Sequence, residues 1–140
     1  MVLQIPKRYL SLQQANRMLG TVKRSLRKMI RLDNALNTLS SIEVVYDDYY
    51  DAVTYDVQYD KKFHQLSFQF FNEHEKLFRL GAVVHSVEEG IVYFFSKFNK
   101  RDILLCWQLG EKQVSFWHEI DETFFDRKPI ASLVDGARVK

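Results

Sequence analysis

The sequence predicts an α+β fold in which a long antiparallel helical hairpin precedes a four-stranded antiparallel β-meander. Apolar residues recur at alternating intervals of three and four over residues 11–80, which is the spacing of a helical seam. Over residues 81–121, short runs of β-branched and aromatic residues alternate with turn residues. A chain of 140 residues is long enough for one core, so we expect a single domain over residues 1–140, with an irregular tail at 122–140.

The first helix is expected to begin at Leu12, because Ser11 and Gln14 have the spacing of a capping box. It is expected to end near Asn37–Ser40, where short polar side chains favour turns. Its seam consists of Leu12, Ala15, Leu19, Val22, Leu26 and Met29.

A second helix is expected from Ile42 to Leu80, with Gly81 as its C-cap. A break near Asp56–Lys62 is left open, because this stretch contains indifferent helix formers. A short turn at Ser40–Ser41 would make the two helices antiparallel, in the manner of a coiled coil. The second seam consists of Ile42, Val45, Tyr49, Ala52, Tyr59, Phe63, Leu66, Phe70, Leu77 and Leu80.

Four strands are expected over Ala82–Val87, Ile91–Phe98, Ile103–Leu109 and Val114–Ile120. The last two would form a hairpin with its turn at Leu109–Lys112, centred on Gly110 and Glu111. That register pairs Trp107 with Val114 and Cys106 with Ser115. It therefore places Trp107 and His118 on one face of the hairpin and Trp117 on the other.

The hairpin Trp107–Asp121 is similar to the most recognisable segment of an uncharacterised prokaryotic family of small proteins, a domain of unknown function. The shared pattern is Trp107, Gly110, Glu111, Trp117, His118 and Asp121. The resemblance covers roughly Leu80–Pro129, with a weaker match along the helices, and it implies a fold but no activity.

Several polar positions depart from the pattern of the family that the hairpin resembles. His85 and Ser86 stand where a Lys-Asp pair is usual, Tyr93 stands for an acid, and Gln108 stands for an arginine. Thr123 and Asp126 replace glycines. If these polar groups form an active site in the family, the departures imply that this chain has lost it.

His118, Asp121 and Glu119 are the candidate catalytic or metal-ligating residues. A histidine near carboxylates in sequence could ligate a divalent metal or act as a base with an orienting acid. On a continuous strand His118 and Asp121 would point to opposite faces, so they meet only if the chain bends near Glu119. Because no His-Glu-x-x-His or paired-cysteine motif supports a metal, we expect no cofactor, and a structural hydrogen bond from His118 to Asp121.

The remaining reactive residues favour a buried or surface role. Cys106 lies between Leu105 and Trp107, so we expect an inert, buried thiol. His64 and His74 have no ligands at matching spacing on the long helix and are expected at its surface. A single cysteine, the lack of a signal peptide and the lack of a membrane span predict a cytoplasmic protein that does not bind membranes.

The basic run Lys23–Arg31 suggests a nucleic-acid-binding helix. A turn at residues 40–41 would place residue i opposite about residue 81 − i, so the acidic run Asp47–Asp60 would neutralise it across the hairpin. The net charge is only +2. On this basis we do not expect nucleic-acid binding.

The helices also predict self-association. The second helix would be ~58 Å long and the first only ~43 Å, and Phe68, Phe71 and Phe78 lie off the main seam. Uncovered apolar surface of this kind marks an association site, so we expect a homodimer, most simply a four-helix bundle. The resulting hypothesis is a non-enzymatic structural or interaction protein whose biological protein partner is unknown. A small metal-dependent or acid/base enzyme centred on His118 and Asp121, and a nucleic-acid-binding protein, are the alternatives.

Overall fold

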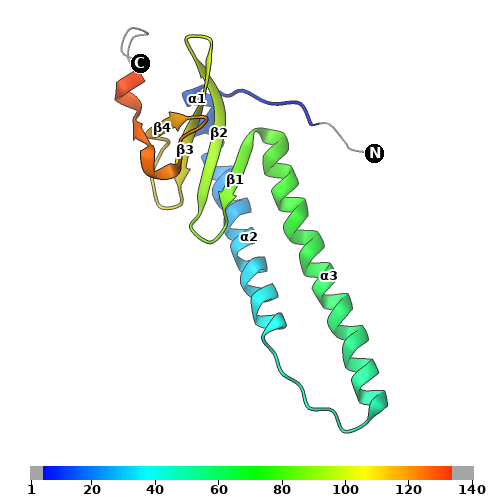
Figure 1. Cartoon of the computed structure of the whole chain (residues 1–140). Coiled ribbons are helices and arrows are strands. Elements are labelled where there is room, and N and C mark those ends of the chain that lie inside the picture. Colours follow the sequence, from blue (N-terminus) through cyan, green and yellow to red (C-terminus); the bar gives the residue numbers. More distant parts are fainter. Residues whose placement is uncertain (1–4, 134–140) are drawn as a thin grey trace.

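A computed structural model describes residues 5–133 of the chain (Figure 1). The helices are α1 (Leu12–Arg17), α2 (Leu19–Ser40) and α3 (Tyr49–Leu80). The strands are β1 (Ala82–Ser86), β2 (Ile91–Phe98), β3 (Arg101–Gln108), β4 (Phe116–Glu119) and β5 (Lys128–Pro129), with short 3-10 helices η1 (Phe124–Asp126) and η2 (Ile130–Leu133). The predicted α+β class is confirmed. The strand number is corrected from four to five, because the segment predicted as an irregular tail adds β5 to the edge of β4.

The start of the first helix is confirmed, but the helix is interrupted. The Ser11 hydroxyl accepts a hydrogen bond from the Gln14 backbone N–H, and the Gln14 side chain accepts one from the Ser11 N–H, as a capping box requires. Met18 has φ −92° and ψ 1°, which separates α1 from α2. The seam of α2 nevertheless lies buried against the sheet and α3.

The third helix begins at Tyr49 and not at Ile42. Its N-cap is Asp48, whose Oδ1 accepts a hydrogen bond of 2.8 Å from the Asp51 backbone N–H. Residues 41–48 form an exposed link, and α3 then continues without a break through Asp56–Lys62. Gly81 ends the helix with φ 101°, so the predicted C-cap is confirmed.

The link shifts the pairing between α2 and α3. Lys28 Nζ lies 3.3 Å from Glu73 Oε2, and Ser25 hydrogen-bonds the same carboxylate. Residue i of α2 therefore lies level with about residue 100 − i of α3, at 1.5 Å of rise per residue in both helices. Residues 49–60 of α3 consequently extend beyond the end of α2 (Figure 1). The predicted opposition of Lys23–Arg31 to Asp47–Asp60 is wrong, because it assumed a tight turn at residues 40–41.

Neighbouring strands in the chain are neighbours in the sheet, in the order β1-β2-β3-β4-β5, and every pair is antiparallel. One face of the sheet forms the main core with the helices. Its buried side chains include Phe94, Ile103, Leu105, Trp107 and Trp117, which pack with Ala15, Leu19, Val22, Leu26 and Leu77. The opposite, outer face carries a smaller cluster of Ile91, Tyr93, Leu104 and Cys106.

The register between β3 and β4 differs by one residue from the predicted register. Cys106 pairs with Phe116, and Leu105 pairs with Trp117. Trp107 and Trp117 therefore share the inner face, whereas His118 lies on the outer face. The shift arises because the Val114 backbone N–H donates to Asn16 Oδ1 at 2.7 Å, so Val114 does not pair with β3 and the strand begins only at Phe116.

No helix within residues 5–133 is both long enough and apolar enough to cross a bilayer.

Candidate functional site

His118 lies on the outer face of β4, and its side chain is fully buried. Its Nδ1 is 2.7 Å from the Glu119 carbonyl oxygen. Its ring meets the Tyr93 ring edge to face, with 4.8 Å between the centroids. Within the described part of the chain its Nε2 has no hydrogen-bond partner. The Nδ1 side of the imidazole is therefore fixed by a polar contact, whereas the Nε2 side is buried.

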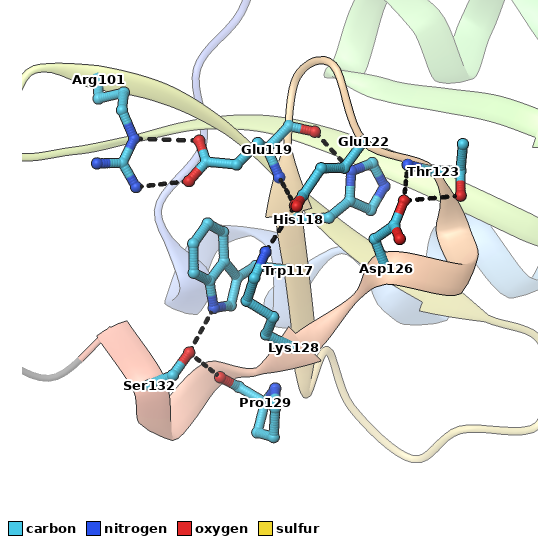
Figure 2. A network of polar contacts seen from close by, with 10 residues as sticks. All are labelled: Arg101, Trp117, His118, Glu119, Glu122, Thr123, Asp126, Lys128, Pro129 and Ser132. Atoms are coloured by element: carbon cyan, nitrogen blue, oxygen red, sulfur yellow. Dashed lines mark hydrogen bonds and ion pairs between the residues drawn. The ribbon is translucent and has the colours of Figure 1, made fainter. Parts of the chain in front are cut away.

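The structure does not bring the side chains of the three predicted site residues together; Figure 2 shows the contacts of His118 and Glu119. Arg101 donates two hydrogen bonds to the Glu119 carboxylate, from Nε to Oε1 at 3.1 Å and from Nη2 to Oε2 at 2.8 Å. Asp121 lies in the exposed turn after β4, and among residues 5–133 no hydrogen bond or ion pair links it to His118. The predicted hydrogen bond from His118 to Asp121 is replaced by the contact with the Glu119 carbonyl, because the short turn after Glu119 directs Asp121 into solvent.

Two carboxylates that were not among the predicted site residues organise this turn (Figure 2). Glu122 Oε1 accepts hydrogen bonds from the Glu119 backbone N–H at 2.9 Å and from Lys128 Nζ at 2.6 Å, and these two donors hold the pKa of Glu122 below its ordinary value. Asp126 Oδ2 accepts from the backbone N–H and the hydroxyl of Thr123, which lowers the pKa of Asp126. Such local carboxylate contacts fix the path of the chain from β4 to β5.

Glu111, at the far end of the hairpin, has a structural role. Its Oε1 accepts from the Gln108 backbone N–H at 3.0 Å, and its carbonyl oxygen accepts from the Trp107 indole at 2.9 Å. Its Oε2 lies 2.8 Å from Arg127 Nη1. Glu111 therefore fixes the turn of the hairpin and joins it to the segment that leads into β5.

Arg127 and Cys106 lie beside each other on the outer face. The Arg127 guanidinium lies between the rings of Phe116 and Phe124, 4.1 Å and 4.2 Å from their centroids. Burial raises the pKa of the Cys106 thiol to about 11, although the neighbouring Arg127 lowers it. At neutral pH the thiol is protonated, which favours the predicted inert role.

His118 ends a row of three rings on the outer face of the sheet. Tyr93 packs against His118, and His85 stacks on the Tyr93 ring at 4.6 Å between centroids. Burial raises the pKa of Tyr93, so this ring is neutral at pH 7. A neutral ring cannot orient the imidazole as an ionised acid would. The geometry around His118 therefore favours packing over acid/base chemistry.

The described residues contain no group of three or more histidine, cysteine, aspartate or glutamate side chains placed to hold a metal ion. His118 and Cys106 share the outer face without a third ligand. His64 is exposed on α3, where its ring meets Phe63 edge to face, and His74 is half-buried nearer the sheet.

A second candidate surface runs along α3, away from its buried seam. Its members recur at intervals of 4, 4, 11, 3 and 7 residues, which places them on one side of a helix. This outer stripe consists of Tyr49, Val53, Val57, Phe68, Phe71 and Phe78. Phe68 and Phe71 are 68% and 62% exposed. At its sheet end the stripe borders an open hollow of about 620 Å³ that also contains Val83 and Val84.

Residues 49–60 of α3, which extend beyond the end of α2, form an overhang. Aromatic rings pack along its inner side. A column of rings formed by Tyr46, Tyr55, Tyr59 and Phe63 has centroid separations of 5.8 Å, 6.0 Å and 6.2 Å. Tyr46 belongs to the link, so the column holds the link against α3. The rings of this column pack on one another on the inner side of α3, away from the outer stripe.

A basic stripe lies on the side of α2 opposite its buried seam, with residues spaced three or four apart. The stripe consists of Lys23, Arg24, Arg27, Lys28 and Arg31. Within residues 5–133, Lys28 is the only one of the five with an ion pair, to Glu73.

Comparison with known proteins identifies the chain without assigning it an activity. No curated protein and no solved structure gives a significant match. Residues 8–130 match the model of a family described as "Uncharacterized conserved protein (DUF2203)", and the chain therefore belongs to this family.

Proposed function

We propose that this protein is a non-enzymatic interaction module that self-associates through α2 and α3 as a homodimer. The observation that carries the proposal is the outer stripe of α3. Its six apolar side chains occupy one side of the helix and are each at least 41% exposed among the residues that the structure describes. Burying one such side chain is worth about 1.5–3 kcal/mol, so association would remove a large unfavourable exposure.

The size of the surface supports a contact that involves both helices. The 32 residues of α3 give a helix ~48 Å long and ~10–12 Å wide, which offers about 500 Å². A stable interface buries about 800 Å² on each partner. Contributions from α2 fill this difference, and the simplest assembly is a four-helix bundle of two hairpins.

The test is the mass of the protein in solution. At micromolar concentration, light scattering coupled to size exclusion should give about twice the chain mass of 16.7 kDa. The double variant Phe68→Asp, Phe71→Asp should give the mass of one chain with unchanged far-ultraviolet circular dichroism, because both positions are exposed in the single copy. A single-chain mass for the unmodified protein would refute the proposal.

Phe125 provides a matched control. It is 89% exposed on η1, outside the helical pair. Phe125→Asp should therefore leave the mass at that of two chains. If this variant dissociates as well, the contact involves the end of the sheet that carries η1, and the assignment to α3 is wrong.

A further inference from the structure

Opposite charges lie at opposite ends of the helical pair. The basic stripe of α2 lies near the sheet, level with about residues 69–77 of α3. The acids lie at the far end, in the link and in the overhang of α3. They are Glu43, Asp47, Asp48, Asp51, Asp56 and Asp60, and all six are exposed. In the part of the chain that the structure describes, none of the six forms an ion pair.

The basic stripe of one copy and the acids of a second copy can lie at the same height along paired α3 helices. Measured from the sheet end of α3, the basic stripe spans about 5–17 Å and residues 49–60 span about 30–47 Å. If two copies of α3 overlap antiparallel over their full ~48 Å, residues 49–60 of one copy lie level with about residues 68–79 of the other. The acids of each copy then lie level with the basic stripe of its partner.

Part of the outer stripe also meets apolar residues of the second copy in the same arrangement. When residue i lies level with about residue 128 − i of the second copy, Val57 meets Phe71 and Tyr50 meets Phe78. Tyr50 is 77% exposed next to the stripe. His64 lies at the centre of the overlap and meets His64 of the second copy. The antiparallel arrangement thus brings apolar residues at both ends of the overlap together and also places opposite charges at the same level.

Resting on the self-association proposed above, we infer that the partner is a second copy of this chain, paired antiparallel along α3 with His64 at the two-fold axis. The opposite, parallel arrangement would place the six acids of one copy beside the same six acids of the other. Charges within about 8 Å interact appreciably at physiological salt, so that arrangement is repulsive. The charge distribution selects the direction, and the apolar stripe holds the copies together.

Disulfide trapping tests the direction. Val57→Cys alone and Phe71→Cys alone should give no crosslinked dimer under mild oxidation, whereas an equimolar mixture of the two should give a crosslinked heterodimer. His64→Cys alone should crosslink at the axis. The unmodified protein is the control, since its single thiol, Cys106, is fully buried. Crosslinking of Val57→Cys to itself, with no heterodimer in the mixture, would show a parallel pair and overturn the inference.

A charge exchange tests the contact between the acids and the basic stripe. Reversing Arg27 and Arg31 to glutamate should weaken association about tenfold or more, as should reversing Asp56 and Asp60 to lysine. A mixture of the two variants should recover the affinity as a heterodimer. Unchanged affinity of the arginine variant, with loss of binding to a labelled oligonucleotide, would instead assign the basic stripe to nucleic acid and overturn the charge pairing.

The two proposals fail in distinguishable ways. The mass of each cysteine variant under reducing conditions is measured first. A single-chain mass for the unmodified protein refutes self-association itself. A two-chain mass with the wrong crosslinking pattern refutes only the antiparallel arrangement.

Discussion

At His118, one imidazole nitrogen contacts a backbone carbonyl, and the other is buried without a hydrogen-bond partner among residues 5–133. A buried polar atom without a partner costs about 1–3 kcal/mol, which a well-packed neighbour can offset. Trp117, the preceding residue, provides such packing on the inner face, where its indole N–H also donates to Ser132 Oγ at 2.8 Å. We therefore expect the tryptophan to contribute more to stability than the histidine.

Trp117→Ala should lower the free energy of unfolding by ~3–5 kcal/mol, because it empties a buried site in the main core. His118→Asn should cost less. Urea denaturation followed by circular dichroism measures both, with Ile120→Ala as a control at a half-exposed site just beyond β4. A loss below ~1 kcal/mol for Trp117→Ala would contradict the packing role.

The same residues distinguish packing from metal binding. EDTA should leave the melting temperature of the unmodified protein unchanged, since the contacts of His118 are with Tyr93 and a backbone carbonyl. A fall in melting temperature that zinc or manganese reverses only when His118 and Asp121 are intact would establish the metal-site alternative instead.

At the scale of elements, Glu73 of α3 forms the main polar contact with α2, through Lys28 and Ser25. Burial raises its pKa, but hydrogen bonds from Ser25, Lys76 and Lys28 outweigh that effect and leave the pKa of Glu73 below its ordinary value. A carboxyl group with a lowered folded-state pKa stabilises the fold above its unfolded-state pKa. That contribution is lost as the pH falls through the folded-state value, below about pH 4.3.

Glu73→Gln should lower the free energy of unfolding by about 1–2 kcal/mol at pH 7 and by less at pH 3, because acid shifts the carboxylate towards its neutral form. Urea titrations at both pH values measure the difference. Glu75→Gln is the matched control, since Glu75 is exposed and pairs only with Arg79 within residues 5–133. An equal loss at pH 7 and pH 3 would show that the effect is steric and not electrostatic.

Local signals in the sequence predict the elements well, and contacts between distant residues decide the rest. The capping box at Ser11, the seam of α2 and the C-cap at Gly81 depend on neighbouring residues and are confirmed. The register of β4 depends on Asn16 and Val114, which lie 98 residues apart in the chain, and no local pattern reveals that hydrogen bond. Ile42 and Val45 continue the helical spacing, yet both are exposed in the link, because no neighbouring element covers them.

For the candidate site, the sequence indicated the residues better than their partners. Trp107, Glu111, Trp117 and His118 are all buried or half-buried around the hairpin. Their contacts come from β2 and from the segment after β4, such as Tyr93 and Arg127, and the folding of the sheet brings these together. Spacing along one strand cannot report contacts of this kind.

Across the whole molecule, the basic stripe is exposed except for the half-buried Lys23, so its access to nucleic acid depends on the assembly. In the antiparallel dimer proposed above, the acids of each copy lie level with the basic stripe of the other and reduce its attraction for phosphate. Labelled single- and double-stranded oligonucleotides should therefore show no submicromolar binding at physiological salt. Submicromolar, salt-sensitive binding that Arg24→Ala combined with Arg27→Ala abolishes would contradict this expectation.

The overhang of α3 links association to helix formation. Residues 49–60 lie beyond the end of α2, and an isolated helix of about 12 residues is marginally stable in water. In a lone copy this end of α3 is therefore the part of the helix most prone to fray, with the column of tyrosine rings as its main support. Pairing with a second copy must order these residues, and the entropy lost in ordering them offsets part of the gain from burying the outer stripe. The proposed dimer should therefore be weaker than a rigid bundle of equal area, and its assembly should respond readily to concentration.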